Sequence, residues 1–400
     1  MSNDLERQSE QDKIRAIRVE LPATERVVYL NTGTNGPLPR RSHTAITEYS
    51  AGELTEGRIG ANVFPRLAKI SDEARADVAA LLRCQPEEVA LTHNTTEGVN
   101  IALMGIDWSP GDEVITSRAE HPGVLYPIYL LRQRFGVRIR MTNIGLPGHD
   151  DVAELKQALS PRTRAVALSH VSWSTGVVLP IRELADATHA AGALFICDAA
   201  QSCGMVPSDV NALGVDVYAC SGQKWLCGPD GTGALFVRKD RLSDIQQSYM
   251  GYMSVTHGMS DHEGHFVPPA AASRYQAATI YPASLVALSA SLRWLSTDVG
   301  WDWAYRRIAS LGAACYDELA ALDGITMITP RDRMAGLIHF SVAGVKPDKL
   351  CERMAVTQGV VVRHTPDPLA VRVSTGFYNT QEDIARLVAA IREAQVALRS

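Results

Sequence analysis

Two residues of opposite charge, Asp198 and Lys224, follow two apolar runs of the chain and could do chemistry together. Asp198 comes directly after ALFIC, and Lys224 follows shortly after VDVYACS. An acid and an amine at neighbouring strand ends suit a site in which one group protonates a ring nitrogen and the other forms an imine with an aldehyde. The alternatives are a structural ion pair for Asp198 and a surface lysine beside a turn for Lys224.

The residues around this pair favour a site from which water is partly excluded. Gln201 lies three residues after Asp198, while Ser221 and Gln223 precede Lys224 and two apolar residues follow it. Burial lowers the pKa of an amine and so favours the neutral form that imine chemistry needs. A carboxylate after such an apolar run is costly unless it meets a cation or a strong hydrogen-bond donor.

Other polar clusters also follow predicted strands. Thr95 and Thr96 of THNTTEG enter a helical pattern, where hydroxyls and free N–H groups at the positive helix end commonly hold phosphate, although Thr95 or Thr96 as a plain N-cap would look the same. His121 of SRAEHPG could be a loop residue, a general base or a flat ring stacked on an aromatic cofactor. Trp173 of SHVSWSTG is either a packing residue or part of a pocket wall.

The elements that must position these residues alternate between strands and helices from about residue 43 to 290. Near-continuous apolar runs separated by helical patterns predict a mostly parallel sheet covered on both faces, and ligands of such sheets bind at the carboxyl ends of the strands. The seven runs are EVALTH (88–93), DEVITS (112–117), VRIRMTN (137–143), RAVALSHV (164–171), ALFICDA (193–199), VDVYACS (215–221) and GALFVRK (233–239).

The two ends of the chain follow another pattern. Short strands around the helix 346–358, and a last helix from 381 to 400 capped by Thr380, predict a small α+β domain. Residues 10–19 read as a short amphipathic helix. We therefore expect an N-terminal helix and loop that join the small domain (1–42), a large domain (43–290) and a small C-terminal α+β domain (291–400).

Two irregular segments could contact a substrate. The loop TNGP contains Asn35, which either meets the substrate or belongs to a linker. Residues 251–273 form a long polar stretch without periodicity, which is rare in a compact domain unless it serves as a lid or binding loop.

Composition excludes several partner classes. A net charge of −5, with 46% hydrophobic and 21% charged residues, fits a globular enzyme and gives no support to a nucleic-acid or membrane partner. The N-terminus lacks the apolar core of a signal peptide and no run of eighteen apolar residues follows, so we expect a cytoplasmic protein. The seven cysteines include no CxxC pair, which favours reduced core thiols and argues against a metal site.

Taken together, the strand-end residues resemble the active site of class V, fold-type I pyridoxal phosphate enzymes. That group includes cysteine desulfurases, isopenicillin N epimerase-like proteins and cystine C–S lyases. The similarity runs from NTGTNGPLP to VRVSTGFYNTQEDI, and it is closest to the cystine lyase branch in NIALMGIDWSPGD, EHPG, SHVSWSTG, CDAAQS and QKWLCGPDG. It implies a large domain with a mostly parallel seven-stranded sheet between helices, and a homodimer with shared active sites.

The resemblance also implies a role for each matching residue. Lys224 forms the Schiff base with pyridoxal 5'-phosphate, Asp198 keeps the ring nitrogen protonated, and His121 stacks on the ring. Gln201 reaches the ring hydroxyl, and Arg372 of AVRVS takes the substrate α-carboxylate, a bidentate task that suits a guanidinium. The residues implied for phosphate are Thr95, Thr96, Ser221, Gln223 and, reaching across to the other subunit's phosphate, Thr279 of RYQAATIYP.

Two departures from the family pattern bear on the reaction. Many relatives carry histidine immediately before the lysine, whereas Gln223 can donate to phosphate but cannot act as an acid or base near neutral pH. Desulfurases need a mobile nucleophilic cysteine, in one branch on the loop after a strand like VVVRH, and here that loop reads TPDPLA. His364 lies in that neighbourhood and is either a pocket residue or a loop histidine.

We therefore expect a C–S lyase that acts by β-elimination on cystine or an S-substituted cysteine, with a thiol or persulfide, pyruvate and ammonia as products. Alternatives in the same fold are an epimerase, an aminotransferase, decarboxylation-linked oxidative deamination and a desulfurase-like reaction. A non-catalytic protein of this fold is disfavoured because Lys224, Asp198 and Arg372 are all present. A nicotinamide enzyme would need G-x-G-x-x-G after its first strand, and the chain lacks it.

Overall fold

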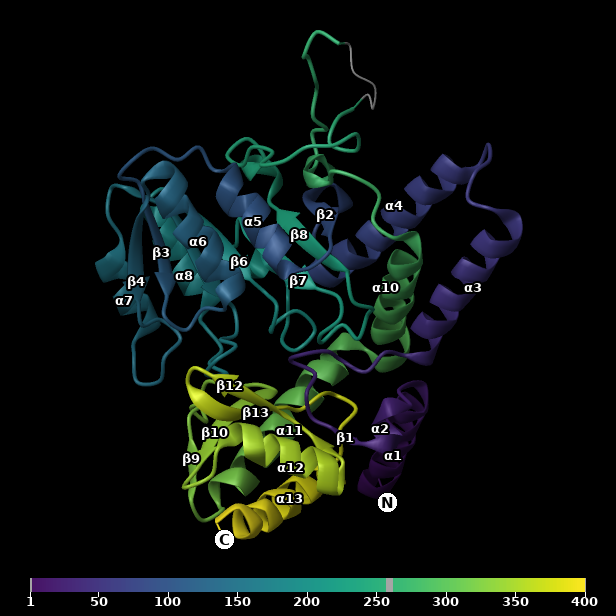
Figure 1. Ribbon diagram of the computed structural model, residues 1–400, viewed down its shortest axis with the longest axis vertical. Helices are drawn as coiled ribbons and strands as arrows, with labels where there is room; N and C mark the ends of the chain where they lie inside the picture. Colours follow the sequence, from purple (N-terminus) through teal and green to yellow (C-terminus); the bar gives the residue numbers. More distant parts are fainter. Residues whose placement is uncertain (1, 257–261, 400) are drawn as a thin grey trace.

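A seven-stranded sheet lies at the centre of the upper lobe of the molecule (Figure 1). In the computed structural model, which describes residues 2–256 and 262–399, its strands run in the order β2-β8-β7-β6-β5-β3-β4. Only β8 is antiparallel to its neighbours, so the predicted mostly parallel sheet is confirmed. The strands are β2 (Val89–Thr92), β3 (Glu113–Ser117), β4 (Arg138–Thr142), β5 (Thr163–Ser169), β6 (Leu194–Asp198), β7 (Val217–Ser221) and β8 (Gly233–Val237).

Helices cover both faces of this sheet, which explains why most of its strands read as continuous apolar runs. Side chains that alternate along the strands belong to two separate core clusters. In one cluster they pack with the helix residues Leu103 and Ile128, and in the other with the helix residues Leu82, Leu184 and Leu288. No helix in residues 2–256 and 262–399 is long and apolar enough to cross a membrane. The helices are α3 (Arg40–Glu56), α4 (Val63–Leu82), α5 (Thr95–Gly105), α6 (Pro122–Phe135), α7 (Asp151–Ala158), α8 (Ile181–Ala190), α9 (Val210–Leu213) and α10 (Pro282–Trp294), with the 3₁₀ turns η1 (Pro86–Glu88), η2 (Lys239–Arg241) and η3 (Ala272–Tyr275).

The lower lobe is built on a four-stranded antiparallel sheet in the order β12-β13-β10-β9. Its core joins Phe340 and Val371 of the sheet to Leu319, Met354 and Leu387 of the helices. The predicted domain boundaries at residues 42 and 290 stay a prediction. The elements are β9 (Ile325–Met327), β10 (Leu337–Val342), β12 (Arg363–Pro366), β13 (Leu369–Ser374), α11 (Trp301–Ala320), α12 (Pro347–Gln358), α13 (Gln381–Arg399) and the π-helical turn η4 (Leu295–Val299).

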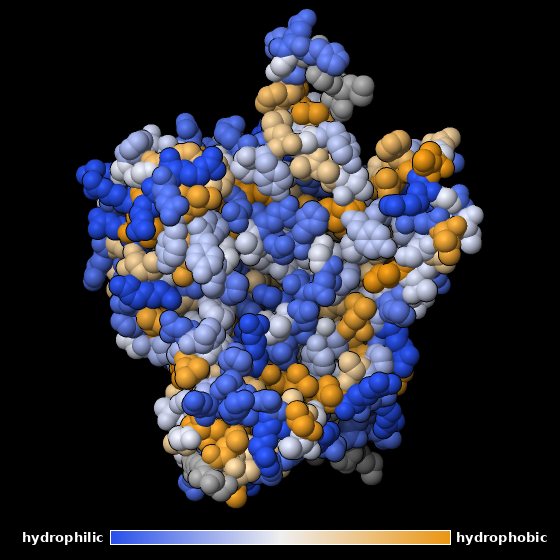
Figure 2. All heavy atoms as spheres, viewed as in Figure 1, coloured by the Kyte–Doolittle hydropathy of each residue, from blue (hydrophilic) through white to orange (hydrophobic). Residues whose placement is uncertain are grey.

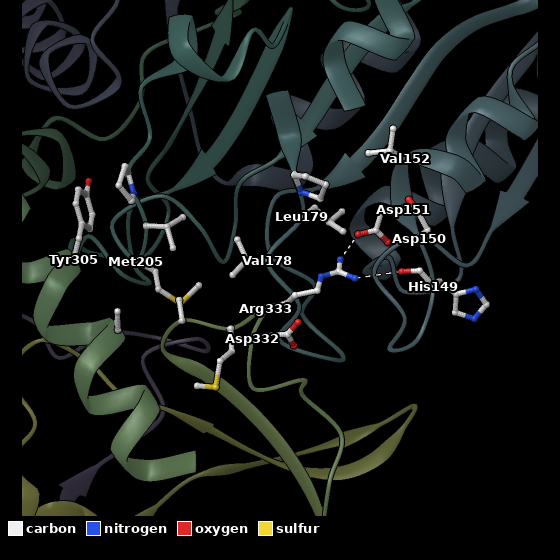
Figure 3. A pocket seen from close by; sticks show the side chains of 16 residues that line it. His149, Asp150, Asp151, Val152, Val178, Leu179, Met205, Tyr305, Asp332 and Arg333 are labelled. Atoms are coloured by element: carbon white, nitrogen blue, oxygen red, sulfur yellow. Dashed lines mark hydrogen bonds and ion pairs between the residues drawn. The ribbon is translucent and has the colours of Figure 1, made fainter. Parts of the chain in front are cut away.

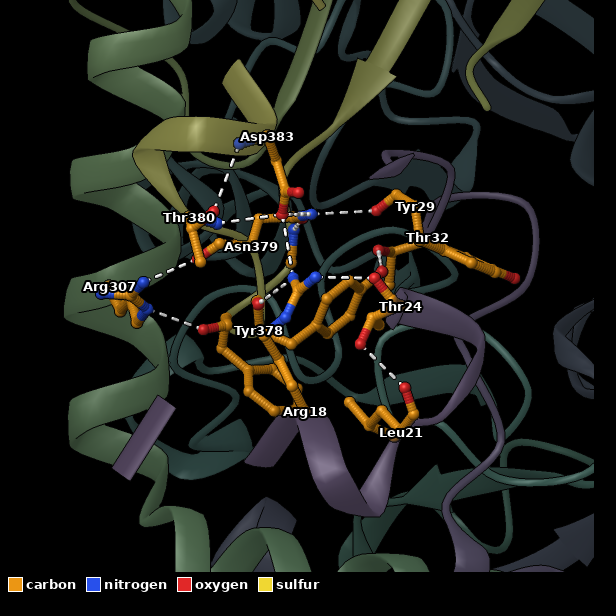
Figure 4. A network of polar contacts seen from close by, with 12 residues as sticks. Arg18, Leu21, Thr24, Tyr29, Thr32, Arg307, Tyr378, Asn379, Thr380 and Asp383 are labelled. Carbon is orange, nitrogen blue, oxygen red and sulfur yellow. Dashed lines mark hydrogen bonds and ion pairs between the residues drawn. The ribbon is translucent and has the colours of Figure 1, made fainter. Parts of the chain in front are cut away.

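The N-terminal segment packs against the lower lobe (Figure 4). It contains α1 (Ser2–Glu20), α2 (Ala23–Arg26) and β1 (Val28–Tyr29), and β1 pairs in parallel with β11 (Val360–Val361). The Arg18 guanidinium lies 3.1 Å from the Asp383 carboxylate and donates to the carbonyl oxygens of Thr24 and Tyr378 at 2.6 and 3.3 Å. The segment that leads into residues 31–36 is therefore anchored to the lower lobe.

The last helix begins at the predicted cap. The backbone N–H of Asp383 donates to the Thr380 hydroxyl at 3.2 Å, and the Asp383 carboxylate accepts from the backbone N–H of Thr380 at 3.1 Å. This reciprocal pair satisfies two amide groups that the first turn leaves free. The prediction of Thr380 as the helix cap is confirmed.

Candidate active site

The carboxyl ends of β6 and β7 bring Asp198 and Lys224 to one edge of the sheet. Asp198 is the last residue of β6 and only 6% exposed. Its Oδ1 accepts from the backbone N–H of Ala200 at 2.8 Å, and its Oδ2 has no hydrogen bond to any described residue. Burial raises the pKa of Asp198, while the charge of Lys224 opposes that rise. One carboxylate oxygen is therefore available to a ligand.

The Lys224 amine has neither a salt bridge nor a side-chain hydrogen bond within residues 2–256 and 262–399. Burial lowers the pKa of Lys224 to about 8; Asp198 opposes this shift, and Arg372 and Arg363 add to it. A larger fraction of this amine is neutral near physiological pH than of a solvated lysine. That property suits nucleophilic attack on an aldehyde.

A hydroxyl pair lies at the start of α5. The Oγ1 of Thr95 and the Oγ of Ser221 are 2.6 Å apart, and the backbone N–H of Thr95 donates to the same Ser221 oxygen at 3.1 Å. Thr96 is exposed, and a Cβ at Gly123 would lie only 2.5 Å from its hydroxyl, so glycine makes room for it. Asn94 caps the helix, which makes the alternative of Thr95 or Thr96 as N-cap wrong. The two threonines instead form the first turn, where an anion is favoured.

His121 and Trp173 meet edge to face at the next strand ends. Their ring centroids are 5.0 Å apart with an interplanar angle of 86°. The Nδ1 of His121 accepts from the backbone N–H of Gly123 at 3.0 Å, while part of the residue stays exposed. Partial burial, with the charges of Lys224, Arg363 and Arg372 adding to it, lowers the pKa of His121 to about 4. The imidazole is therefore neutral at neutral pH.

Trp173 also connects this edge to the lower lobe. Its backbone carbonyl lies 2.9 Å from the Nε2 of His339, and His339 pairs with Arg372 across β10 and β13. Its own indole Nε1 is buried without a hydrogen-bond partner among the described residues. A buried N–H donor of this kind usually has a partner.

Two guanidinium groups, those of Arg363 and Arg372, lie side by side on β12 and β13. Both donate to the hydroxyl of Thr34, at 3.2 and 2.8 Å, and neither has a carboxylate partner in the described part of the chain. Arg372 is only 1% exposed and its Nε has no partner. Burial and the charge of Arg363 lower the pKa of Arg372 to about 9. An unpaired buried cation is costly, so this arrangement favours an anionic ligand.

Sequence reasoning missed Arg363 and named its neighbour His364. Successive residues of a strand point to opposite faces, so His364 lies on the face of β12 away from Arg363 and Arg372. His364 is exposed. Arg363 could have been identified from the pairing of the two hairpin strands, because Arg363 and Arg372 lie opposite each other.

A second missed side chain is Glu120, the residue before His121. Its carboxylate accepts from the backbone N–H and the hydroxyl of Ser169 at 2.8 and 2.5 Å, and Ser169 pairs with Asp198 across β5 and β6. Burial, followed by the charge of Asp198, raises the pKa of Glu120 to about 8. Glu120 thus fixes the strand end beside Asp198. No sequence spacing distinguishes it from an ordinary loop acid.

The two predicted glutamines have different environments. The Nε2 of Gln201 donates to the carbonyl of Gly33 at 2.8 Å, and its Oε1 accepts from the Trp225 indole at 3.1 Å. An amide carries two N–H donors, so one remains for a ligand hydroxyl. The Oε1 of Gln223 is buried without a partner among the described residues.

The structure does not connect two other predicted residues to Lys224. The Nδ2 of Asn35 donates to the Asp230 carboxylate at 3.2 Å, and Asn35 is exposed. Thr279 is also exposed, and its hydroxyl lies 2.5 Å from the Tyr252 hydroxyl. Their proposed contacts with substrate and with a second subunit stay predictions.

The candidate lid at residues 251–273 is described only in part, because residues 257–261 lie outside the described residues. At its base, the backbone N–H of Thr256 donates to the carbonyl of Val267 at 2.8 Å. Figure 1 shows the described part projecting away from the lower lobe. Its role as a lid or binding loop stays a prediction.

Figure 3 shows a cavity of about 700 Å³, and Lys224 is not among its lining residues. Arg333, which lines it, is already paired with the Asp151 carboxylate. None of the predicted site residues lines this cavity, so we place the chemistry at Lys224. The lining residues are 149–152, 178–180, 205–207, Tyr305, Ala309 and 332–335.

The fold, with a lysine and a buried carboxylate at adjoining strand ends, places the chain among the fold-type I enzymes. The family model "Aminotransferase class-V" matches residues 28–387, and the chain belongs to that family. A cysteine desulfurase of Haloferax volcanii is 30% identical, with 96% of this chain and 97% of the relative covered. A probable cysteine desulfurase of Pseudomonas aeruginosa is 31% identical, with 94% and 96% covered.

Solved structures agree with this family. A complex of the cystine C–S lyase C-DES with its reaction product cysteine persulfide has a TM-score of 0.88 at 28% identity, with 93% of this chain and 98% of that chain covered. A C-DES mutant with glycine covalently linked to its pyridoxal phosphate cofactor has a TM-score of 0.89 at 27% identity, with 94% and 98% covered. The Escherichia coli cysteine desulfurase CsdA has a TM-score of 0.85 at 28% identity, with 96% and 99% covered.

Proposed function

We propose that this protein is a pyridoxal phosphate-dependent lyase that cleaves a C–S bond of cystine by β-elimination. The observation that carries the choice of substrate is the pair Arg363 and Arg372, two guanidiniums without a carboxylate partner in the described residues. Cystine has two carboxylates, and a guanidinium is well suited to each. The similarity to the cystine lyase C-DES supports the same choice.

The residues at the Lys224 edge fit pyridoxal phosphate. Thr95, Thr96 and Ser221 present hydroxyls at the N-terminus of α5, where a phosphate is favoured. The free Oδ2 of Asp198 suits a protonated ring nitrogen, and the unpaired Lys224 amine suits the aldehyde. When bound, this cofactor supplies an electron sink for negative charge on the substrate Cα.

We assign the following work to the chain's own residues. Lys224 Nζ takes the proton from the substrate Cα, and its lowered pKa makes the neutral base available. Arg372 binds the α-carboxylate, and Arg363 binds the distal carboxylate of cystine. Neutral His121 covers the ring and excludes water, and the Trp173 indole N–H is free to donate to the substrate.

The cysteines favour a lyase over a desulfurase. Six of the seven are buried and Cys84 is partly buried. Burial raises the pKa of both Cys84 and Cys227 to about 12, so these thiols are poor nucleophiles. The connection between β12 and β13 is the pair Asp367 and Pro368, without a cysteine. Elimination needs no enzyme thiol: cystine and water give cysteine persulfide, pyruvate and ammonia.

The proposal is tested by incubating the holoenzyme with L-cystine and measuring pyruvate and persulfide together. Equal amounts of the two products are expected. Absence of both would remove the lyase assignment.

A second candidate, cysteine desulfurase activity, is favoured by the names of the relatives in Haloferax volcanii and Pseudomonas aeruginosa. L-cysteine would then give alanine, and a persulfide would form on an enzyme cysteine. Analysis of the carbon product separates the two candidates, because the desulfurase reaction gives alanine whereas elimination gives pyruvate and ammonia.

We also infer that the protein forms a homodimer. Leu54, Ile59 and Phe64 are 86%, 95% and 79% exposed. Figure 2 shows apolar side chains gathered where α3 and α4 meet. An apolar tip of this kind favours a contact with a second copy. The seven free cysteines fit a reducing compartment, so we propose a cytoplasmic location.

A further inference from the structure

A single hydroxyl, that of Thr34, lies between the two guanidinium groups. Its Oγ1 donates to the Oδ1 of Asn31 at 2.7 Å, which uses its only proton. The two lone pairs accept from Arg372 Nη2 at 2.8 Å and from Arg363 Nη1 at 3.2 Å. Every hydrogen-bonding position of the hydroxyl is therefore used, and its orientation is fixed.

The segment that carries Thr34 is held by the upper lobe. The carbonyl of Gly33 accepts from the Nε2 of Gln201 at 2.8 Å, and the backbone N–H of Gly36 donates to the carbonyl of Gln223 at 2.7 Å. Gln223 is the residue before Lys224. The position of Thr34 is thus tied to the strand end that carries the lysine.

The lower lobe holds the same segment from the other side. The hydroxyls of Thr32 and Tyr378 are 2.6 Å apart (Figure 4). The backbone N–H of Ser374 donates to the carbonyl of Leu30 at 2.8 Å. Ser374 lies two residues after Arg372 on β13. Thr34 is therefore fixed relative to both the arginines and the lysine.

The absence of charge on Thr34 is as important as its position between the two guanidinium groups. Two adjacent guanidiniums repel each other, and an acidic residue between them would neutralise the charge that a substrate needs. A hydroxyl orients both groups and leaves both charges for the ligand. We infer that Thr34 is a positioning residue that aligns Arg363 and Arg372 for a substrate with two carboxylates. The choice of cystine as that substrate rests on the proposed function.

The test compares Thr34→Val, which keeps the shape and removes the hydroxyl, with Thr34→Ser, which keeps the hydroxyl. Glutarate, a dicarboxylate that cannot react, serves as the probe, and its Kd for each holoenzyme is measured by calorimetry. Thr34→Val is expected to weaken glutarate binding about tenfold, as loss of a hydrogen bond to a charged group predicts. Thr34→Ser should stay within about threefold of wild type.

Kinetics separate positioning from a structural role. For cystine, Thr34→Val should raise KM by a similar factor while kcat and the visible cofactor absorbance stay near wild type. Thr357→Val, which removes an exposed hydroxyl on α12, is the matched control and should change nothing.

Three results would overturn the inference: wild-type affinity for glutarate in Thr34→Val, equal damage from both Thr34 substitutions, or no glutarate binding by the wild-type protein. Weakened glutarate binding in Thr34→Val together with no turnover of cystine would keep the positioning role and remove the proposed substrate. The two ideas can therefore fail separately.

Discussion

At the scale of single residues, the Lys224 amine has neither a salt bridge nor a side-chain hydrogen bond to any residue that the structure describes, and burial lowers its pKa. Asp198 stabilises its positive charge, and burial together with the charges of Arg372 and Arg363 outweighs that effect. The same neighbours act on His121, which stays neutral for the same reason. Burial and the neighbouring cations thus raise the neutral fraction of Lys224 and keep His121 uncharged at neutral pH.

Replacement of Lys224 by alanine tests its covalent role. Lys224→Ala should abolish turnover and the visible Schiff-base absorbance, because no other amine takes its place. Absorption spectra of the purified proteins, before and after borohydride, are the measurement. Lys239→Ala, at an exposed lysine beside β8, is the control and should keep the band. A borohydride-reducible band in Lys224→Ala would contradict the assignment.

The pH dependence of cofactor capture follows from the lowered pKa of Lys224. The amine is protonated below about pH 8 and neutral above it, whereas an ordinary lysine becomes neutral only near 10.5. The rate at which cofactor-free protein forms its Schiff base should therefore rise with pH and reach half its maximum near pH 8. Stopped-flow absorbance measures this rate. A rate that keeps rising toward pH 10 would show that the lysine is not desolvated.

The sequence alone identified residues that follow a predicted strand directly. It missed residues whose position depends on how strands pair or on contacts between distant segments of the chain. Asp198 and Lys224 could be found because an apolar run ends just before each. Thr34 could not, because its role arises from hydrogen bonds to Arg363 and Arg372, which lie 329 and 338 positions away in sequence. Asn94, not a threonine, caps α5, since a cap and the residues after it look alike in sequence.

At the scale of elements, the register of the β12–β13 hairpin decides which side chains face the proposed substrate site. Arg363 and His364 are consecutive, yet the strand turns them to opposite faces. Arg363→Ala should raise KM for cystine about tenfold or more, because a charge-assisted contact is lost. The KM for S-methylcysteine, which has one carboxylate, should change much less.

His364→Ala is the matched control for that prediction. It removes the neighbouring side chain on the other face of β12, so KM for both substrates should stay near wild type. A larger effect from His364→Ala than from Arg363→Ala would overturn the assignment of faces.

The strands of the upper sheet could be predicted because burial on both faces leaves an apolar run in each. Helices α3 and α11 were not predicted, and both begin without a side-chain cap that would mark the start in sequence. Strand β1 has two residues, was not predicted, and pairs with β11 from a distant part of the chain. Short elements of this kind depend on tertiary contacts, which local patterns do not contain.

At the scale of the whole molecule, the site needs both lobes. The lysine comes from the upper lobe, the arginines come from the lower lobe, and residues 31–36 hydrogen-bond to both. The proposed dimer adds a further level, because no residue that the structure describes covers the apolar tip of α3 and α4.

A charge at that tip tests the dimer. Phe64→Glu should weaken self-association at least about tenfold, because it places a charge in an apolar contact. Sedimentation at several protein concentrations measures the effect. Val356→Glu, at an 81% exposed apolar residue on α12, is the control and should leave association unchanged. A wild-type protein that stays monomeric at all concentrations would contradict the proposed dimer.

The central claim is that the chain eliminates sulfur from cystine without using a thiol of its own. The most direct test treats the native holoenzyme with iodoacetamide and then assays L-cystine turnover. We predict that pyruvate and cysteine persulfide still form in equal amounts at close to the untreated rate, because six cysteines are buried and Cys84 is partly buried. Loss of activity on alkylation, or alanine as the product in place of pyruvate, would contradict the account.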